Sequence, residues 1–497
     1  MSAFAWVRVW FRSVPLPAGG ALGLHDDPPA LGLVLLLGGL VACAEPPPSK
    51  DPAGQDEAGG QADSGADDTG AASFFLPASR CGLAHSILPP EAGPSGPAMG
   101  ALLAAERDPG LSLTAAAINT LLNAQGLDGL LEARFDVDTY RVRYQTQDRG
   151  APVEATGFVV LPRAAGRVPT LLWTHPTVGF ADACAPTALG LEGAAFPVLF
   201  ASAGFAVAAP DYLGMNGWGP PSAQLHPYIV AEPTALASLD NLRALQKVLA
   251  GPASTIGTTA DPQRLVHWGA SEGGFAALWT DRMQAAYAPG FRTIATVAVV
   301  PPTAVVGLAA QAVSAYQPAS VGLAGVLVGM NDWYRADDLD AVLQPGPAAA
   351  LPVEVRADCA RFPTLETLDT VDALFTPALI DAAASNDWSA LPDWGCRLAE
   401  SGLLTTAVPR GHDAPVFVVT AENDALVAAA PTRADVPRLC AAGYTVQYQE
   451  CAGASHTEGA ANSLPAQWAW IQDRLAGLPV SEACVVGPPV PCPPLGG

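Results

Sequence analysis

The residues best suited to covalent chemistry lie at 269–274, which read Gly-Ala-Ser-Glu-Gly-Gly. They contain the pattern G-x-S-x-G, in which a serine stands on a sharp turn between a strand and a helix, and the glycines avoid clashes beside it. Such a turn exposes the hydroxyl of Ser271 and directs the backbone N–H of Glu272 at a developing oxyanion. Because the apolar run 265–268 precedes the motif and a helical pattern follows it, we favour a nucleophile over a merely structural turn.

A serine nucleophile needs a base, and on a strand–turn–helix motif of this kind the acid and then the histidine follow the serine along the chain. Two histidines, His412 and His456, follow Ser271. His456 comes just after the last strand-like run, 445–450, and before the final helical pattern, so we predict it to be the base. His412 precedes a strand-like run and is expected in a surface loop. His175 is disfavoured because it precedes the serine.

The acid that orients the base is expected after the preceding strand-like run, 416–420. Two carboxylates follow that run, Glu422 and Asp424. We favour Asp424, because it fits the A/E-x-D-x-x-V pattern of many acid-bearing loops in this arrangement, and Glu422 stays as the alternative. The carboxylate would hold the tautomer of His456 and stabilise its imidazolium form without taking a proton itself.

An oxyanion hole needs a second donor besides Glu272, and it normally comes from the loop after an early central strand. Here that loop follows the strand-like run 170–174. We predict the backbone N–H of Thr177 to be the second donor, with its hydroxyl as a further contact. Gly179 is the alternative.

The elements that must position these residues alternate between strands and helices. Runs that are apolar on both faces suit parallel strands covered by helices on both sides, and a polar–apolar alternation at 140–146 and 155–162 around a turn at 148–150 predicts a hairpin. This alternation predicts an α/β fold with a mostly parallel central sheet and helices on both faces. The buried strand-like runs are 170–174, 205–210, 265–269, 296–300 and 416–420, and the helical segments are 233–249, 272–288, 432–442 and 461–475.

The chain resembles the secretory lipase family of α/β-hydrolases, the fungal lipase A type and its bacterial relatives. The matching stretches are 140–162, Cys184-Ala185-Pro186, 210–214, His226-Pro227-Tyr228, 269–274, 422–427 and 453–456. The resemblance covers roughly residues 80–478. It implies hydrolysis of carboxylic esters and a helical lid inserted between the strands that carry the nucleophile and the acid.

The stretch 303–412 has room for such a lid within a hydrolase domain at 74–480. A lid would shield the ester from water and supply an acyl pocket, for which Met330, Trp333 and Tyr334 are the candidate lining residues. A helical insertion that only completes the core, with these three as core residues, is the alternative. Three further polar residues are expected to shape the rim of the site or to hold a loop, namely Asp211, Tyr212 and His226.

The N-terminal residues predict export. An apolar run at 31–42 is too short to span a bilayer and has the length of a signal-peptide core. It ends on Leu40-Val41-Ala42-Cys43, which resembles a bacterial lipobox, so we expect a lipoprotein signal at 1–43, a lipid on Cys43 and a place in the bacterial cell envelope. An ordinary signal peptide and a freely secreted protein are the alternative. Residues 44–73 hold seven acidic residues, one lysine and no aromatic or large aliphatic residue, which is typical of a disordered linker.

Composition excludes several partners. The net charge is −23 and Lys50 and Lys247 are the only lysines, so nucleic-acid binding and a polybasic membrane patch are not expected. The nine cysteines include no C-x-x-C pair, which removes the usual support for a zinc site. The triad chemistry needs neither a metal nor an organic cofactor. We expect a monomer whose partners are an ester substrate and, through Cys43, a membrane.

If Cys43 carries a lipid, the eight remaining cysteines allow four disulfides. Proximity along the sequence favours Cys440–Cys451, then Cys359–Cys396 inside the lid and Cys484–Cys492 in the Pro/Gly-rich tail at 481–497. Cys81–Cys184 remains by elimination.

The function favoured by these observations is that of a serine esterase or lipase of the carboxylic ester hydrolase class, working through an acyl-enzyme. Two rivals stay open: a serine peptidase or amidase with the same three residues, and a catalytically silent surface-binding protein on the same scaffold. The presence of serine, acid and histidine in the expected order argues against the silent protein.

Overall fold

The structure, a computed structural model, describes residues 80–495 apart from 83, 92–97, 125–126 and 128–130. The predicted signal segment with Cys43 and the predicted linker at 44–73 lie outside the described residues. Within the described part of the chain, no helix is both long enough and apolar enough to cross a bilayer.

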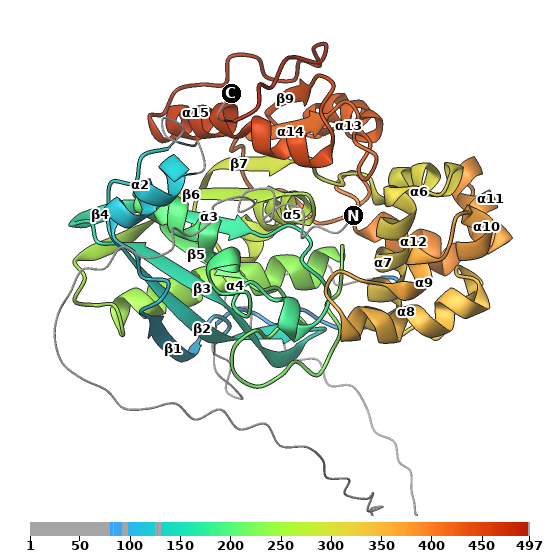
Figure 1. The fold of residues 1–497 in the computed structure, drawn as a ribbon, viewed down its shortest axis with the longest axis horizontal. Helices are drawn as coiled ribbons and strands as arrows, with labels where there is room; N and C mark the ends of the chain where they lie inside the picture. Colours follow the sequence, from blue (N-terminus) through green and yellow to red (C-terminus); the bar gives the residue numbers. More distant parts are fainter. Residues whose placement is uncertain (1–79, 83, 92–97, 125–126, 128–130, 496–497) are drawn as a thin grey trace, which may run out of the picture. The chain divides into compact units, whose positions relative to one another are not determined.

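A single sheet runs through the described domain (Figure 1). Its strand order is β1-β2-β3-β5-β4-β6-β7-β8-β9. The first three pairings, from β1 to β5, are antiparallel, and the remaining five are parallel. This is the mostly parallel α/β sheet that the sequence predicted. The strands are β1 (Leu102–Asp108), β2 (Val137–Asp148), β3 (Ala151–Pro162), β4 (Gly166–Thr174), β5 (Ala206–Pro210), β6 (Thr258–Ala270), β7 (Thr293–Val299), β8 (Val416–Ala421) and β9 (Val446–Cys451).

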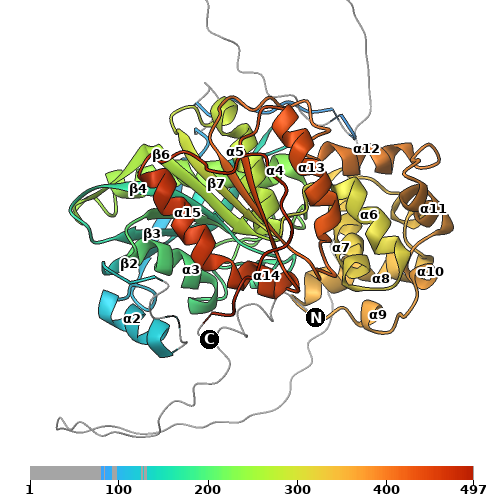
Figure 2. The same ribbon diagram turned by 90° about the horizontal axis from the view of Figure 1, so that it is seen from above.

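Helices cover both faces of the sheet (Figure 2). Successive side chains of a strand point to opposite faces, so Val266 and Trp268 of β6 pack in one core, and Leu265 packs in the other. On the first face lie α2 (Ala115–Ala124), α3 (Leu191–Ser202) and α15 (Leu464–Leu475), and on the second lie α4 (Ala231–Ala250), α5 (Glu272–Tyr287) and α13 (Ala429–Ala441). The two cores hold β6 and α5 in place on both sides of Ser271.

The chain between β7 and β8 is helical and forms the insertion at the side of the sheet (Figure 1). We call α6 to α12 the cap. Its Leu343 and Phe375 form one isolated antiparallel bridge, and the described residues of the cap contain no longer strand. The cap helices are α6 (Val305–Ser314), α7 (Pro318–Trp333), α8 (Pro345–Ala357), α9 (Pro363–Glu366), α10 (Val371–Leu374), α11 (Pro377–Ser385) and α12 (Pro392–Glu400).

Four disulfides are present among the described residues, and all four predicted pairings are wrong. The observed bonds are Cys81–Cys396, Cys184–Cys359, Cys440–Cys484 and Cys451–Cys492, in place of Cys440–Cys451, Cys359–Cys396, Cys484–Cys492 and Cys81–Cys184. Proximity along the sequence is a poor guide here because the fold brings distant segments together. Cys81 and Cys396 are 315 residues apart in sequence, yet their Cα atoms are 5.6 Å apart.

The C-terminal tail lies along the edge strand β9. Val490 pairs in parallel with Cys451, and its backbone N–H donates to the carbonyl of Glu450 at 2.8 Å. Cys484 and Cys492 bond the tail to α13 and to β9 respectively. The tail therefore satisfies backbone groups that an edge strand would leave unpaired.

Candidate active site

Ser271 stands on the turn between β6 and α5, with φ of 59° and ψ of −122°. This left-handed backbone is uncommon for a residue with a side chain. The glycines beside it are required by packing: a Cβ on Gly269 would lie 2.1 Å from the carbonyl oxygen of Gly273, and a Cβ on Gly273 would lie 2.1 Å from that of Thr174. The N–H of Ser271 donates to the carbonyl of Val299 at 2.8 Å. A positive φ at a serine and glycines required by close backbone contacts are typical of the turns that carry a nucleophile.

Asp424 and His456 are paired after the ends of β8 and β9. The distance from His456 Nδ1 to Asp424 Oδ2 is 2.6 Å. The side chain of Asp424 is fully buried, and its Oδ1 accepts from the N–H groups of Leu426 and Val427 at 2.9 and 2.8 Å. A carboxylate in that position holds the proton on Nδ1 and leaves the lone pair on Nε2.

The other predicted carboxylate points elsewhere. Glu422 is exposed, and its Oε2 accepts from the N–H of Gly453 at 2.7 Å. It therefore braces the turn after β9, and the structure places Asp424, not Glu422, against His456.

Ser271 and His456 line the same cavity, of about 400 Å³. Nε2 of His456 is buried and makes no hydrogen bond to the described residues. The walls are mainly apolar, and cap residues supply much of them: Pro318, Val321, Gly322, Ala324, Gly325, Val328, Leu351, Val355 and Leu365. An imidazole nitrogen with no hydrogen-bond partner among the described residues and a serine thus line one mainly apolar cavity.

Thr177 lies in this cavity as well, beside Pro176. Its hydroxyl is 2.9 Å from that of Tyr228, which also lines the cavity. Gly179 is not among the lining residues, and a Cβ there would lie 2.5 Å from the sulfur of Cys184. Of the two predicted oxyanion donors in this loop, Thr177 is therefore the one that reaches the chamber.

The three predicted lining residues lie outside the cavity, and this prediction is wrong. Met330 is fully buried in the core, the Trp333 indole N–H donates to Asp148 at 3.0 Å, and the Tyr334 hydroxyl donates to Glu400 at 2.8 Å. Trp333 and Tyr334 line a different cavity of about 190 Å³, which includes neither Ser271 nor His456. The residues of α7 that line the cavity of Ser271 lie mostly in the N-terminal half of the helix. Because a helix rises 1.5 Å per residue, Met330 and Trp333 at its C-terminal end lie several ångströms further along the axis. The small residues Gly322, Ala324 and Gly325, which do line the cavity, were not among the predicted lining residues.

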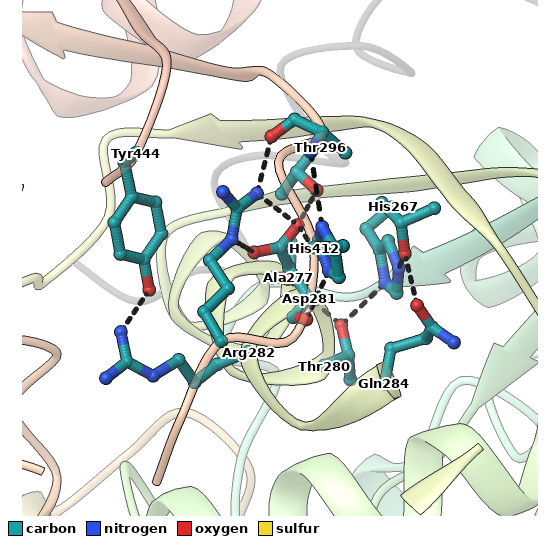
Figure 3. Close-up of polar contacts among 12 residues, drawn as sticks. His267, Ala277, Thr280, Asp281, Arg282, Gln284, Thr296, His412 and Tyr444 are labelled. Carbon is teal, nitrogen blue, oxygen red and sulfur yellow. Dashed lines mark hydrogen bonds and ion pairs between the residues drawn. The ribbon is translucent and has the colours of Figure 1, made fainter. Parts of the chain in front are cut away.

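His412 lies away from Ser271, in the polar cluster of Figure 3. Its Nε2 is 2.9 Å from the carbonyl oxygen of Asp281, whose buried carboxylate also pairs with Arg410 at 2.7 Å. The Arg410 guanidinium holds the pKa of the Asp281 carboxyl below its usual value despite the desolvation that opposes it. His412 thus helps to anchor the chain leaving the cap onto α5, and it lies half-buried rather than in an open surface loop.

Asp211, Tyr212 and His226 are completely buried beneath the site rather than at its rim. The Asp211 carboxyl accepts from the hydroxyls of Thr156 and Thr187, and burial raises its pKa to about 6. The Tyr212 hydroxyl donates to the carbonyl of His175 at 2.9 Å. The Tyr212 bond therefore holds the loop that leads to Thr177, and the Asp211 carboxyl ties Thr156 of β3 to Thr187. The described residues contain no group of three or more His, Cys, Asp or Glu side chains arranged to hold a metal ion.

Comparison with known proteins identifies relatives with this architecture. The sequence pattern of the secretory lipases matches residues 194–349 and 382–483, which together exceed half of the chain. Lipase A of Arthroderma benhamiae is 24% identical over 377 residues, covering 70% of this chain and 72% of that protein.

Two solved structures share the fold. The rice cell wall degrading esterase LipA from Xanthomonas oryzae is 23% identical, with a TM-score of 0.63 over 77% of this chain and 99% of that one. Candida antarctica lipase A in its closed state is 16% identical, with a TM-score of 0.59 over 79% of this chain and 86% of that one.

Proposed function

This chain belongs to the secretory lipase family, and from that premise we propose that it hydrolyses carboxylic esters through Ser271, His456 and Asp424 by way of an acyl-enzyme. The observation that carries the proposal is the apolar cavity that holds Ser271 together with the free Nε2 of a histidine paired to Asp424. The family and the folds of the lipases and esterases it resembles support ester hydrolysis as the reaction class.

In the first half of the reaction, His456 Nε2 takes the proton of Ser271 as the hydroxyl oxygen attacks the ester carbonyl carbon. The backbone N–H groups of Glu272 and Thr177 donate to the oxyanion of the tetrahedral intermediate, and one such donor is worth about 3 kcal/mol. The C–O bond to the alcohol then breaks, and His456 returns the proton to the leaving alkoxide. The acyl group stays on Ser271 as an ester.

In the second half, water attacks the acyl carbonyl and gives a proton to the same Nε2. The tetrahedral intermediate collapses, Ser271 recovers its proton from His456, and the carboxylic acid leaves. Asp424 stays ionised throughout and stabilises the imidazolium that forms twice in each cycle.

We also propose where the protein acts and with which partners. The family and the four disulfides fit an exported protein, since disulfides persist in oxidising compartments. We further propose anchoring to the bacterial envelope by a lipid on Cys43, with the enzyme acting as a monomer on an ester substrate and with no nucleic-acid partner.

A paired substrate series tests the reaction class. The purified full chain is given p-nitrophenyl esters from acetyl to palmitoyl and, in parallel, matched p-nitroanilides of the same acyl groups. We expect turnover of the esters at least about 100-fold faster than of the anilides. Cleavage of the anilides without the esters would identify a peptidase or amidase instead, and turnover of neither would favour the silent binding protein.

A further inference from the structure

A second buried pair lies directly behind the nucleophile. The Glu272 carboxylate, on the residue after Ser271, has its Oε1 2.6 Å from Nε2 of His226, and both side chains are almost fully shielded from water. The other oxygen, Oε2, is buried and makes no hydrogen bond to the described residues. A full negative charge on this carboxylate would therefore depend on His226 for compensation.

The contacts of His226 determine the charge of the pair. Nδ1 is 3.0 Å from the carbonyl oxygen of Leu213, and since a carbonyl only accepts, Nδ1 carries a hydrogen. A single further proton then lies between Nε2 and Glu272 Oε1. Whether that proton resides on the imidazole or on the carboxyl, the net charge of the pair is zero.

Neutrality matters because Glu272 also supplies a proposed oxyanion donor. Ser271 and Glu272 together line a small cavity of about 60 Å³, so the two residues border the same region. An uncompensated carboxylate on the residue next to the nucleophile would oppose a developing oxyanion and slow acylation by roughly 10- to 100-fold in a medium of reduced dielectric constant.

We propose that His226 is a positioning residue that keeps its pair with Glu272 electrically neutral, so that the site beside it can accept the negative charge of the tetrahedral intermediate. This inference rests on the proposed ester hydrolysis and extends it, since it assigns a role to a residue outside the triad. His226 acts through Glu272 and touches no substrate in this account.

The surrounding titratable groups do not offer a substitute positive charge. The ring of Tyr212 stacks on His226 with centroids 5.6 Å apart. Burial raises the pKa of Tyr212 and of Tyr228, so both phenols stay neutral. Burial lowers the pKa of His175, although the Glu272 carboxylate opposes this effect, so His175 is neutral near pH 7. His226 remains as the partner that balances Glu272.

The test is a double-variant cycle, assayed by ester kcat and KM across about pH 6 to 9. His226→Gln is expected to lower kcat with little change in KM, because the buried carboxylate of Glu272 then lacks the partner that balances its charge. Adding Glu272→Gln to His226→Gln removes the charge and should restore most of the lost kcat.

The chain offers a matched control pair. His85 Nε2 lies 2.8 and 3.0 Å from the two carboxylate oxygens of Glu232, and both residues lie outside the cavity of Ser271. His85→Gln should lower the melting temperature without lowering kcat. If His226→Gln fails to fold, Glu272→Gln alone gives the test: it keeps the pair neutral, so it should lose no more than about tenfold in kcat at any pH.

Two results would overturn the proposal while leaving ester hydrolysis intact. One is a double variant no faster than His226→Gln while the wild type turns over normally. The other is a loss in Glu272→Gln as large as that in His226→Gln. Failure of the proposed function would look different, because the wild type itself would then show no ester turnover.

Discussion

Replacing Ser271 with alanine is expected to lower kcat for ester hydrolysis by at least about 10⁴-fold. The methyl group has no oxygen to attack the carbonyl, so no acyl-enzyme forms and the remaining rate comes from binding and the oxyanion donors alone. KM should change little, because the cavity walls that contact the acyl group are untouched. Steady-state kinetics on a p-nitrophenyl ester measures the effect.

Ser254→Ala is the matched control for this variant. Ser254 is exposed on the loop after α4, so its loss should leave both kcat and the melting temperature at wild-type values. Ser271→Ala itself should keep the wild-type melting temperature to within a few degrees. Retention of more than a few per cent of wild-type activity by a folded Ser271→Ala protein would contradict the mechanism.

The second large effect is expected from Asp424→Asn, with kcat falling by about 10³- to 10⁴-fold. An asparagine amide can donate to His456 Nδ1, which then accepts and leaves the hydrogen on Nε2. In that tautomer His456 cannot take the proton of Ser271. Because the backbone N–H groups of Leu426 and Val427 can still donate to the side-chain oxygen, the loop should fold as before.

Glu422→Gln separates the two candidate acids. The Glu422 side chain is exposed and accepts from the Gly453 N–H, a bond that a glutamine oxygen can also accept. Its kcat should stay within about threefold of wild type. A loss in Glu422→Gln comparable with that in Asp424→Asn would mean that the orienting carboxylate has been misassigned.

Much of the sheet could be predicted because its signals are local. The hairpin follows from alternation at 140–146 and 155–162 around Arg149 and Gly150, which both have positive φ. The parallel strands follow from runs that are apolar on both faces. β1, α2 and α3 were missed. β1 is half-exposed and lacks the alternation of buried and exposed residues that is typical of a strand. α3 is apolar on all sides and contains Pro197, so it lacks the one-sided apolar pattern that is typical of a surface helix.

In the candidate site, too, residues with local sequence signals could be predicted, and features that depend on distant segments could not. Ser271 could be found because a strained turn needs glycines at fixed positions, and Asp424 and His456 because they follow buried strands at one edge of the sheet. The disulfides and the cavity walls depend on which distant segments meet. Phe180 and Leu351, for example, line one chamber from opposite parts of the chain. No local pattern encodes such a meeting, and an aromatic cluster such as Trp333 and Tyr334 is as typical of a core as of a pocket.

The proposal that Ser271 becomes acylated is tested most directly by a fluorophosphonate probe that bonds covalently to activated serines. The wild-type chain is labelled, digested and mapped by mass spectrometry. We predict one adduct, on the peptide that contains Ser271, and none in Ser271→Ala. Labelling that persists in Ser271→Ala, or that maps to another serine, would contradict the account.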